Sequence, residues 1–383
     1  MFDFNYIDRK NTDCLKWDYF DDEIPMWVAD MDFRLAPAIL EAIENRARHP
    51  VFAYNKVPEE LYDSYISWWQ RRYDLKMERD ELLFATGVLA SITSILRVFT
   101  KEGDNVLLQT PVYHSFFHVI ENNNRNVLEN PLIFNDGRYS IDFDDLDKKL
   151  AHTKVFILCN PHNPIGKIWS GEDLKKMCDL CKKHDVVLVS DEIHGDLTDP
   201  GIKYNPCARF SDYEKIITTI APTKTFNIAG IQNSMIFTRN KEIHELLEKR
   251  LVSDFFSEIN SFSAPATIAA FNESEDWLEE LREVIYENKV FLDEYLKENI
   301  PQIKMIESEA TYLMWLDISS IPMKSQEFSD YLREKQGLFL SPGIEFGQNG
   351  DDFLRMNIAC PRELLIKGLE ALKRGVNEVF KGD

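Results

Sequence analysis

Short runs of apolar and β-branched residues recur through the middle of the chain. Four of these runs are apolar at most successive positions: 153–159, 186–190, 215–220 and 232–238. Such runs predict strands that are buried on both faces, as in a parallel sheet. A helical pattern over 171–184 joins the first two runs, so the sequence predicts a β-α-β unit and an α/β fold.

The C-terminal third repeats these patterns on a smaller scale. A helical stretch rich in Glu and Lys covers about 275–298, and apolar runs at 311–318 and 353–360 predict strands. An amphipathic helix is expected to close the chain over 363–380. We therefore expect a large domain with a mostly parallel central sheet covered by helices, and a smaller α/β domain.

A length of 383 residues is large for a single hydrophobic core. We predict an N-terminal segment over 1–45 that packs with the small domain. The large domain is predicted over 46–285 and the small C-terminal domain over 286–383.

Acidic residues outnumber basic ones by 65 to 44, which gives a formal net charge of −21. A polyanion is repelled by nucleic acids and by anionic membrane surfaces, so we expect neither as a partner. The sequence has no run of about 18 apolar residues and starts without an apolar signal core. We expect a cytoplasmic protein.

The six cysteines are scattered, and only Cys178 and Cys181 form a C-x-x-C pair. The pair lies inside the helical pattern at 171–184. Two small residues on one helix face explain it better than zinc or redox chemistry, because no second pair is present. No metal site is predicted.

Polar residues follow three of the predicted strands, where an α/β sheet binds its ligands. Lys224 stands in APTKTFNIAG, and a lysine amine that loses its proton can add to a carbonyl. Asp191 ends an apolar strand, where a carboxylate needs a partner such as a protonated pyridine nitrogen. Asn163 offers an amide N–H to an oxygen anion. Taken singly, each also fits a surface lysine, a capping aspartate or a turn.

Further candidates lie outside these three positions. Gly87 and Val88 open a helical run whose free N–H groups favour a phosphate, and Tyr113 can stack on a planar ring. His194 can donate to a phenolic oxygen on such a ring. Arg355 stands on an apolar strand, where it needs an anion such as a substrate carboxylate. A plain helix start, a structural histidine and an internal ion pair remain the alternatives.

The order of these features resembles the aspartate-aminotransferase superfamily, fold type I of the pyridoxal-phosphate enzymes. The resemblance covers nearly the whole chain and is greatest to the MalY/PatB type of carbon–sulfur lyase, or cystathionine β-lyase type. The matching stretches are WVADMDF (27–33), FAYNKVPEELYDSYISWWQRRY (52–73), NPHNPIGKIW (160–169), SDEIHGDL (190–197), TKTFNIAGIQ (223–232), PGIEFG (342–347) and FLRMNIACPRELL (353–365).

The resemblance implies roles for the ring-binding residues. Pyridoxal 5'-phosphate would be bound by the large domain, with Lys224 carrying it as a Schiff base. Asp191 would pair with the pyridine nitrogen, Asn163 would bond to the phenolic oxygen, and Tyr113 would stack on the ring. His194 is counted with these cofactor-binding residues.

The resemblance also implies how phosphate, substrate and a second subunit are bound. Backbone N–H groups of Gly87 and Val88 would hold the phosphate. Arg355 would take the substrate carboxylate, beside Ala29 and Asp30. Tyr54 would reach into the site of a neighbouring subunit, which implies a homodimer.

The implied reaction is α,β-elimination of cystathionine or a related S-substituted cysteine to pyruvate, ammonia and a thiol. An aminotransferase of small amino acids is the alternative, because spacing does not separate the two reactions. A regulatory protein with a transcription-factor partner is a further alternative. The sequence departs from the broader pattern at His194, where many aminotransferases have tyrosine, and at Ala221 and Gln232, where relatives place phosphate ligands. The remaining phosphate ligands are left open.

Overall fold

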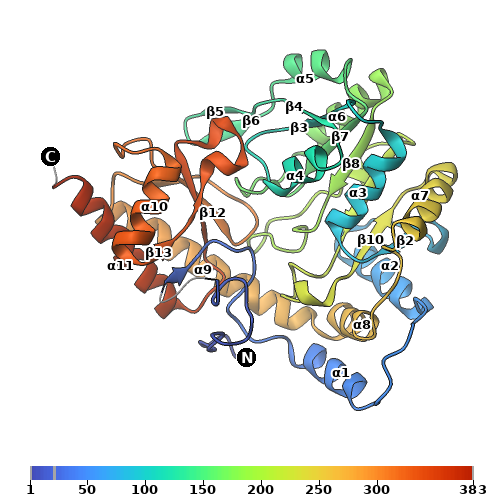
Figure 1. The fold of residues 1–383 in the computed structure, drawn as a ribbon, viewed down its shortest axis with the longest axis horizontal. Coiled ribbons are helices and arrows are strands. Elements are labelled where there is room, and N and C mark those ends of the chain that lie inside the picture. The colour runs from blue at the N-terminus through green and yellow to red at the C-terminus, as the bar shows by residue number, and fades with distance from the viewer. Residues whose placement is uncertain (1, 20–22, 382–383) are drawn as a thin grey trace.

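A seven-stranded mixed sheet forms the centre of the larger part of the molecule (Figure 1). The computed structural model describes residues 2–19 and 23–381. In spatial order the strands are β2 (Leu82–Ala85), β10 (Ser234–Phe237), β9 (Ile216–Ile220), β8 (Val187–Asp191), β7 (Val155–Cys159), β3 (Asn105–Leu108) and β4 (Asn126–Glu129). The predicted α/β fold with helices over a central sheet is confirmed.

The prediction of parallel strands holds for β7, β8 and β9 but is wrong for β10. Strand β10 pairs antiparallel with both β9 and β2. A parallel return would need a crossover across the sheet, usually through a helix. The link from β9 to β10 contains only the short 3-10 turn Ala229–Ile231, so the chain runs back along the neighbouring strand.

Helices cover both faces of this sheet, and side chains alternate between the two faces along each strand. In β7, Val155, Ile157 and Cys159 join one apolar cluster, whereas Phe156 and Leu158 join the other. The first cluster also contains residues of α3 (Val88–Phe99), α4 (Ser115–Glu121) and α7 (Lys241–Ser253). The second contains residues of α2 (Glu59–Tyr73), α5 (Phe143–Leu150), α6 (Gly171–His184) and α8 (Ser263–Glu273). Burial on both faces explains why these strands lack a polar alternation.

Helix α6 shows how local sequence sets an element's limits. Its N-cap residue Ser170 accepts a hydrogen bond from Asp173 N, and the left-handed residue Asp185 ends it. Cys178 and Cys181 both lie on its buried face.

A smaller four-stranded sheet lies beside the large one (Figure 1). Its order is β11 (Lys304–Met305), β12 (Leu313–Asp317), β15 (Phe353–Asn357) and β14 (Ser341–Pro342). The helices around it are α9 (Glu275–Asn299), α10 (Ser325–Gln336) and α11 (Arg362–Val379). Helix α9 runs without a break through residues 285 and 286, so the domain limits given above stay a prediction.

The N-terminal segment contacts both units. Strand β1 (Ile24–Pro25) pairs in parallel with β13 (Leu338–Phe339) of the smaller unit. Helix α1 (Pro37–Ala47) then packs on α8 of the larger one.

The remaining strands of the described chain, β5 (Ile133–Asn135) and β6 (Arg138–Ser140), form a separate antiparallel hairpin. Within residues 2–19 and 23–381, no helix has the length and apolar character needed to cross a membrane.

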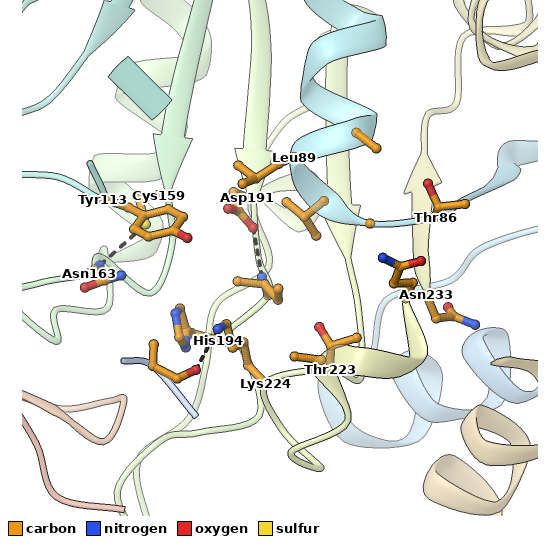
Figure 2. A pocket seen from close by; sticks show the side chains of 17 residues that line it. Thr86, Leu89, Tyr113, Cys159, Asn163, Asp191, His194, Thr223, Lys224 and Asn233 are labelled. Carbon is orange, nitrogen blue, oxygen red and sulfur yellow. Dashed lines mark hydrogen bonds between the residues drawn. The ribbon is translucent and has the colours of Figure 1, made fainter. Parts of the chain in front are cut away.

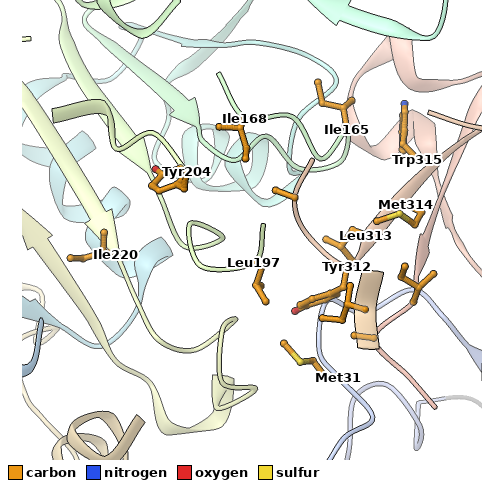
Figure 3. Close-up of a cluster of buried hydrophobic side chains, with 14 of the residues drawn as sticks. Met31, Ile165, Ile168, Leu197, Tyr204, Ile220, Tyr312, Leu313, Met314 and Trp315 are labelled. Atoms are coloured by element: carbon orange, nitrogen blue, oxygen red, sulfur yellow. The ribbon is translucent and has the colours of Figure 1, made fainter. Parts of the chain in front are cut away.

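One hydrophobic cluster joins the N-terminal segment to both sheets (Figure 3). Met31 comes from the N-terminal segment, Leu197 from the loop after β8, Tyr312 from the position directly before β12, and Leu313 from the first position of β12. All four side chains are at most 3% exposed. Their packing fixes the segment around residue 29 against the carboxyl ends of the large sheet.

Candidate active site

A pocket of about 270 Å³ opens where β7, β8 and β9 end and α3 begins (Figure 2). Eight of the residues predicted from the sequence line it: Ala29, Gly87, Val88, Tyr113, Asn163, Asp191, His194 and Lys224. Thr86, Leu89, Ala90, Cys159, Ile193, Thr223, Ala229, Gln232 and Asn233 complete the wall. The structure therefore brings together residues that lie up to 204 positions apart in the sequence.

Lys224 lies in the turn after β9, and its amine is directed across the pocket (Figure 2). Nζ donates a hydrogen bond to the Ala29 carbonyl oxygen at 2.7 Å. Burial lowers the pKa of Lys224 to about 8, and the positive charge of Arg355 acts in the same direction. The carboxylates of Asp30 and Asp191 oppose this lowering. A substantial fraction of the amine is therefore neutral near physiological pH and can act as a nucleophile or a base.

A hydroxyl next to Lys224 fixes this turn. Thr225 Oγ1 donates to the buried carboxylate of Asp196 at 3.0 Å. Trp68 Nε1 donates to the same carboxylate at 2.9 Å, and Tyr73 also bonds to it. This contact ties the loop that carries Lys224 to the loop that carries His194.

Asp191 is the last residue of β8 and is 4% exposed. Its Oδ1 accepts a hydrogen bond from Ile193 N at 3.1 Å, and within the described chain no cation forms an ion pair with it. Burial raises the pKa of this carboxyl to about 7, although the Ile193 N–H and the Lys224 charge oppose the rise. A cation placed in the pocket would stabilise the ionised form.

Arg355 and Asn163 meet behind the pocket. Arg355 is 3% exposed and donates from Nη1 to Asn163 Oδ1 at 3.2 Å and from Nη2 to the Trp27 carbonyl at 2.7 Å. Among the described residues, no carboxylate forms an ion pair with this guanidinium, and its Nε has no partner. Burial lowers the pKa of Arg355 to about 10, while Tyr113 and Glu345 oppose the lowering. A buried cation without an anion is the arrangement expected of a binding site for a carboxylate.

His194 and Tyr113 lie beside the polar residues of the pocket (Figure 2). His194 Nδ1 is buried and has no hydrogen-bond partner among the described residues. Burial lowers the pKa of His194 to about 3, and the charges of Lys224 and Arg355 add to this effect. The ring is therefore neutral and can donate from one nitrogen only. Tyr113 is half-buried and presents an aromatic face to the pocket.

The N-terminus of α3 forms another side of the pocket. Gly87 precedes the helix, and in the described structure no side chain caps this end. The first helical hydrogen bond runs from Ser91 N to Gly87 O at 2.9 Å, which leaves the N–H groups of residues 88–90 free. A Cβ built on Gly87 would meet no atom within 4 Å, so a ligand can approach the backbone there.

Three predicted site residues, Arg355, Tyr54 and Asp30, do not line the pocket, although Arg355 contacts the lining residue Asn163. Tyr54 is 97% exposed and lies outside the pocket. The Asp30 carboxylate bonds to Arg9 at 2.7 Å and approaches Lys16 at 3.4 Å. All three assignments stay predictions.

Two hydroxyl residues at the site were not identified from the sequence. Thr223 lines the pocket, and its position directly before Lys224 is the signal that could have indicated it. Tyr312 donates from its hydroxyl to the Ala29 carbonyl at 3.0 Å, on the same oxygen that Lys224 uses. No sequence pattern connects residues 29, 224 and 312, because their contact arises from the fold.

These features fit pyridoxal phosphate. The free N–H groups at the start of α3 suit a phosphate dianion. Among residues 2–19 and 23–381, the Asp191 carboxylate has no cation partner, which a protonated pyridine nitrogen would supply, and His194 Nδ1 has no hydrogen-bond partner, which a phenolic oxygen would supply. Gln232 lines the pocket with a φ of 54°, a backbone conformation seldom found outside functional sites and turns.

Known proteins are similar to this chain over nearly its full length. The family model described as aminotransferase class I and II matches residues 22–372. Cystathionine β-lyase PatB of Bacillus subtilis is 38% identical over 97% of this chain and 98% of its own.

Two solved structures are similar throughout. Cystalysin from Treponema denticola, which contains pyridoxal 5'-phosphate, has a TM-score of 0.96 at 32% identity and covers 99% of this chain and 100% of its own. The pyridoxal-phosphate-bound C–S lyase from Staphylococcus hominis has a TM-score of 0.93 at 33% identity, with 98% of both chains covered. Taken with the pocket, these matches show that the chain belongs to the class I and II aminotransferase family.

Proposed function

We propose that this protein is a pyridoxal-phosphate-dependent carbon–sulfur β-lyase. It eliminates the sulfur group of cystathionine or a related S-substituted cysteine, and releases pyruvate, ammonia and a thiol. The observation that carries the proposal is a pocket with a buried amine of lowered pKa and a carboxylate that has no cation among the described residues, next to a guanidinium that has no carboxylate partner among them and is bonded to the lining residue Asn163. Similarity to cystathionine β-lyase and C–S lyase proteins supports elimination as the reaction.

The cofactor would be held by residues already placed around the pocket. Residues 88–90 would hold its phosphate through backbone N–H groups, and Lys224 Nζ would carry its carbonyl carbon. Asp191 would keep a proton on the ring nitrogen, because the ionised carboxylate gains a cation there. Asn163, His194 and Tyr113 would fix the ring. When bound, pyridoxal phosphate supplies a conjugated electron acceptor for the electron pair of the substrate Cα–H bond.

The substrate would be oriented by Arg355. Its planar guanidinium can bind the α-carboxylate with two parallel hydrogen bonds. The Trp27 and Asn163 contacts keep the guanidinium in place before substrate arrives. A carboxylate held there would keep the substrate in one orientation relative to the amine of Lys224.

Lys224 would move the proton. The amine of Lys224, once free, would remove the proton from the substrate Cα. The resulting ammonium would then give its proton to the sulfur that leaves. One residue thus serves as base and as acid, which is possible because its pKa lies near the operating pH.

The proposal includes a homodimer. Tyr54 is 97% exposed on the loop before α2, and Phe52 on the same loop is 55% exposed. A second copy that covers this loop would bury both side chains and carry Tyr54 to the pocket of its partner. The cytoplasmic location stays a prediction.

Incubation of the purified protein with cystathionine and no keto acid tests the function. Elimination predicts that pyruvate and homocysteine accumulate in equal amounts over many turnovers, and that Lys224→Ala abolishes both. One turnover per subunit, with activity restored by a keto acid, would instead establish an aminotransferase.

A further inference from the structure

Tyr312 lies directly before β12, and its side chain is fully buried. Its hydroxyl donates to the Ala29 carbonyl oxygen at 3.0 Å, and Lys224 Nζ donates to the same oxygen at 2.7 Å. A carbonyl oxygen has two lone pairs, so these two donors occupy both. The fold thus places a neutral hydroxyl and the reactive amine on one shared acceptor at the pocket wall.

We propose that Tyr312 is a positioning residue for Lys224. By sharing the Ala29 carbonyl, its hydroxyl fixes the place where the free amine rests and favours the neutral amine over the ammonium. The inference rests on the proposed function, in which Lys224 is the base that removes the Cα proton.

The direction of the effect follows from the roles of donor and acceptor. A carbonyl only accepts, so the phenol must be the donor, and burial raises the pKa of Tyr312 so that its proton stays in place. The positive end of the O–H dipole faces the shared oxygen. This reduces the negative potential that the oxygen presents to Lys224. An ammonium loses more by this reduction than a neutral amine does.

Other groups that face Lys224 act at longer range. Asp30 on the N-terminal segment and Asp191 on β8 favour the ammonium, whereas Arg355 on β15 opposes it. His194, on the loop after β8, is neutral, since burial lowers its pKa to about 3. The Tyr312 hydroxyl is the group that acts on the oxygen to which Nζ is bonded.

The segment around Ala29 does not depend on Tyr312 alone. Arg355 Nη2 bonds to the Trp27 carbonyl at 2.7 Å, and Asn357 Nδ2 bonds to the Val28 carbonyl at 2.6 Å. On the other side, Asn227 Nδ2 bonds to the Met31 carbonyl at 2.9 Å. These bonds should keep the Ala29 carbonyl in place in Tyr312→Phe, so the substitution removes the hydroxyl and little else.

The test compares Tyr312→Phe with Tyr139→Phe. Tyr139 is also buried, and its hydroxyl accepts from Trp315 Nε1 at 3.1 Å, outside the pocket. In the full-length chain freed of cofactor, competitive labelling with acetic anhydride, followed by peptide mass spectrometry, gives the pH at which Lys224 becomes reactive. We expect Tyr312→Phe to raise the proton affinity of Lys224 roughly threefold to tenfold, as the loss of one hydrogen bond allows. Tyr139→Phe should leave it unchanged.

The same shift is expected in the loaded enzyme, where the acid limb of the kcat profile should move to higher pH in Tyr312→Phe. An unchanged labelling midpoint in a folded Tyr312→Phe chain would overturn the inference. If that variant does not fold, 3-fluorotyrosine at position 312 replaces it, because this stronger donor should lower the midpoint, and no movement would overturn the inference. Labelling needs no substrate, so a failed lyase assay with a shifted midpoint would reject the proposed function and keep Tyr312 as the positioning residue.

Discussion

Replacing Arg355 with methionine should lower activity and, unlike most changes at a buried residue, should not lower stability. Methionine fills much of the same volume without charge. In the folded protein the guanidinium is 3% exposed and has no carboxylate partner among the described residues. Its function in the proposal is to bind the α-carboxylate of the substrate. Before substrate binds, the buried charge therefore lowers the free energy of unfolding.

The expected size of each effect can be worked from the site. Two hydrogen bonds between ionised groups contribute roughly 3–5 kcal/mol, so kcat/KM should fall about 10²- to 10⁴-fold. Burial lowers the pKa of Arg355 to about 10, which corresponds to a cost on the order of 3 kcal/mol in the folded state. The lost bonds to Trp27, Ser341 and Asn163 offset about 1.5–4 kcal/mol of that cost. The free energy of unfolding should therefore stay within about 1.5 kcal/mol of its original value.

The assays are kcat/KM for cystathionine, urea unfolding of the same preparation and visible absorbance of the bound cofactor. Arg355→Lys is the matched control, because it keeps the charge but loses the planar fork, and it should recover only part of the activity. A kcat/KM within threefold of the original would refute the carboxylate role. The carboxylate role would also be refuted if activity fell only in proportion to a loss of stability or of cofactor absorbance.

Three further outcomes follow from the site. Because burial lowers the pKa of Lys224 to about 8, its amine is protonated below that pH, and kcat should rise with pH and level off above about 8; a flat profile from pH 6 to 9 would contradict this. Thr225→Val removes a donor from the buried Asp196 carboxylate and should lower the free energy of unfolding by about 1.5–3 kcal/mol in urea titration, whereas Thr225→Ser should retain most of it. Mixing Tyr54→Phe chains with Lys224→Ala chains should restore activity, because each hybrid dimer then has one intact site; absence of rescue after verified subunit exchange argues against a shared site.

Much of the fold could be predicted because its central strands are apolar on both faces. The predicted strands at 153–159, 186–190 and 215–220 agree with β7, β8 and β9 to within two residues. The antiparallel direction of β10 could not be predicted in this way. An apolar run indicates only that a strand is buried, whereas the length and structure of the link from β9 decide whether β10 runs parallel or antiparallel to it.

The site residues could be predicted where a reactive or polar side chain lies at or just after the end of a strand. Asp191 ends β8, and Asn163 and Lys224 lie four residues beyond β7 and β9, so the sheet itself gathers them. Tyr312 was missed because its contact with Ala29 spans 283 positions. The ion pair of Asp30 with Arg9 was missed for the same kind of reason, since neither residue belongs to a local pattern.

The attachment of the cofactor to Lys224 is the central claim, and reduction of the purified protein with borohydride tests it directly. Borohydride fixes an imine as a stable amine, so digestion and mass spectrometry then locate the cofactor. One pyridoxyl group per chain on the peptide that contains Lys224 is the predicted result. A pyridoxyl group on any other lysine, or an unlabelled Lys224 in an active preparation, would contradict it.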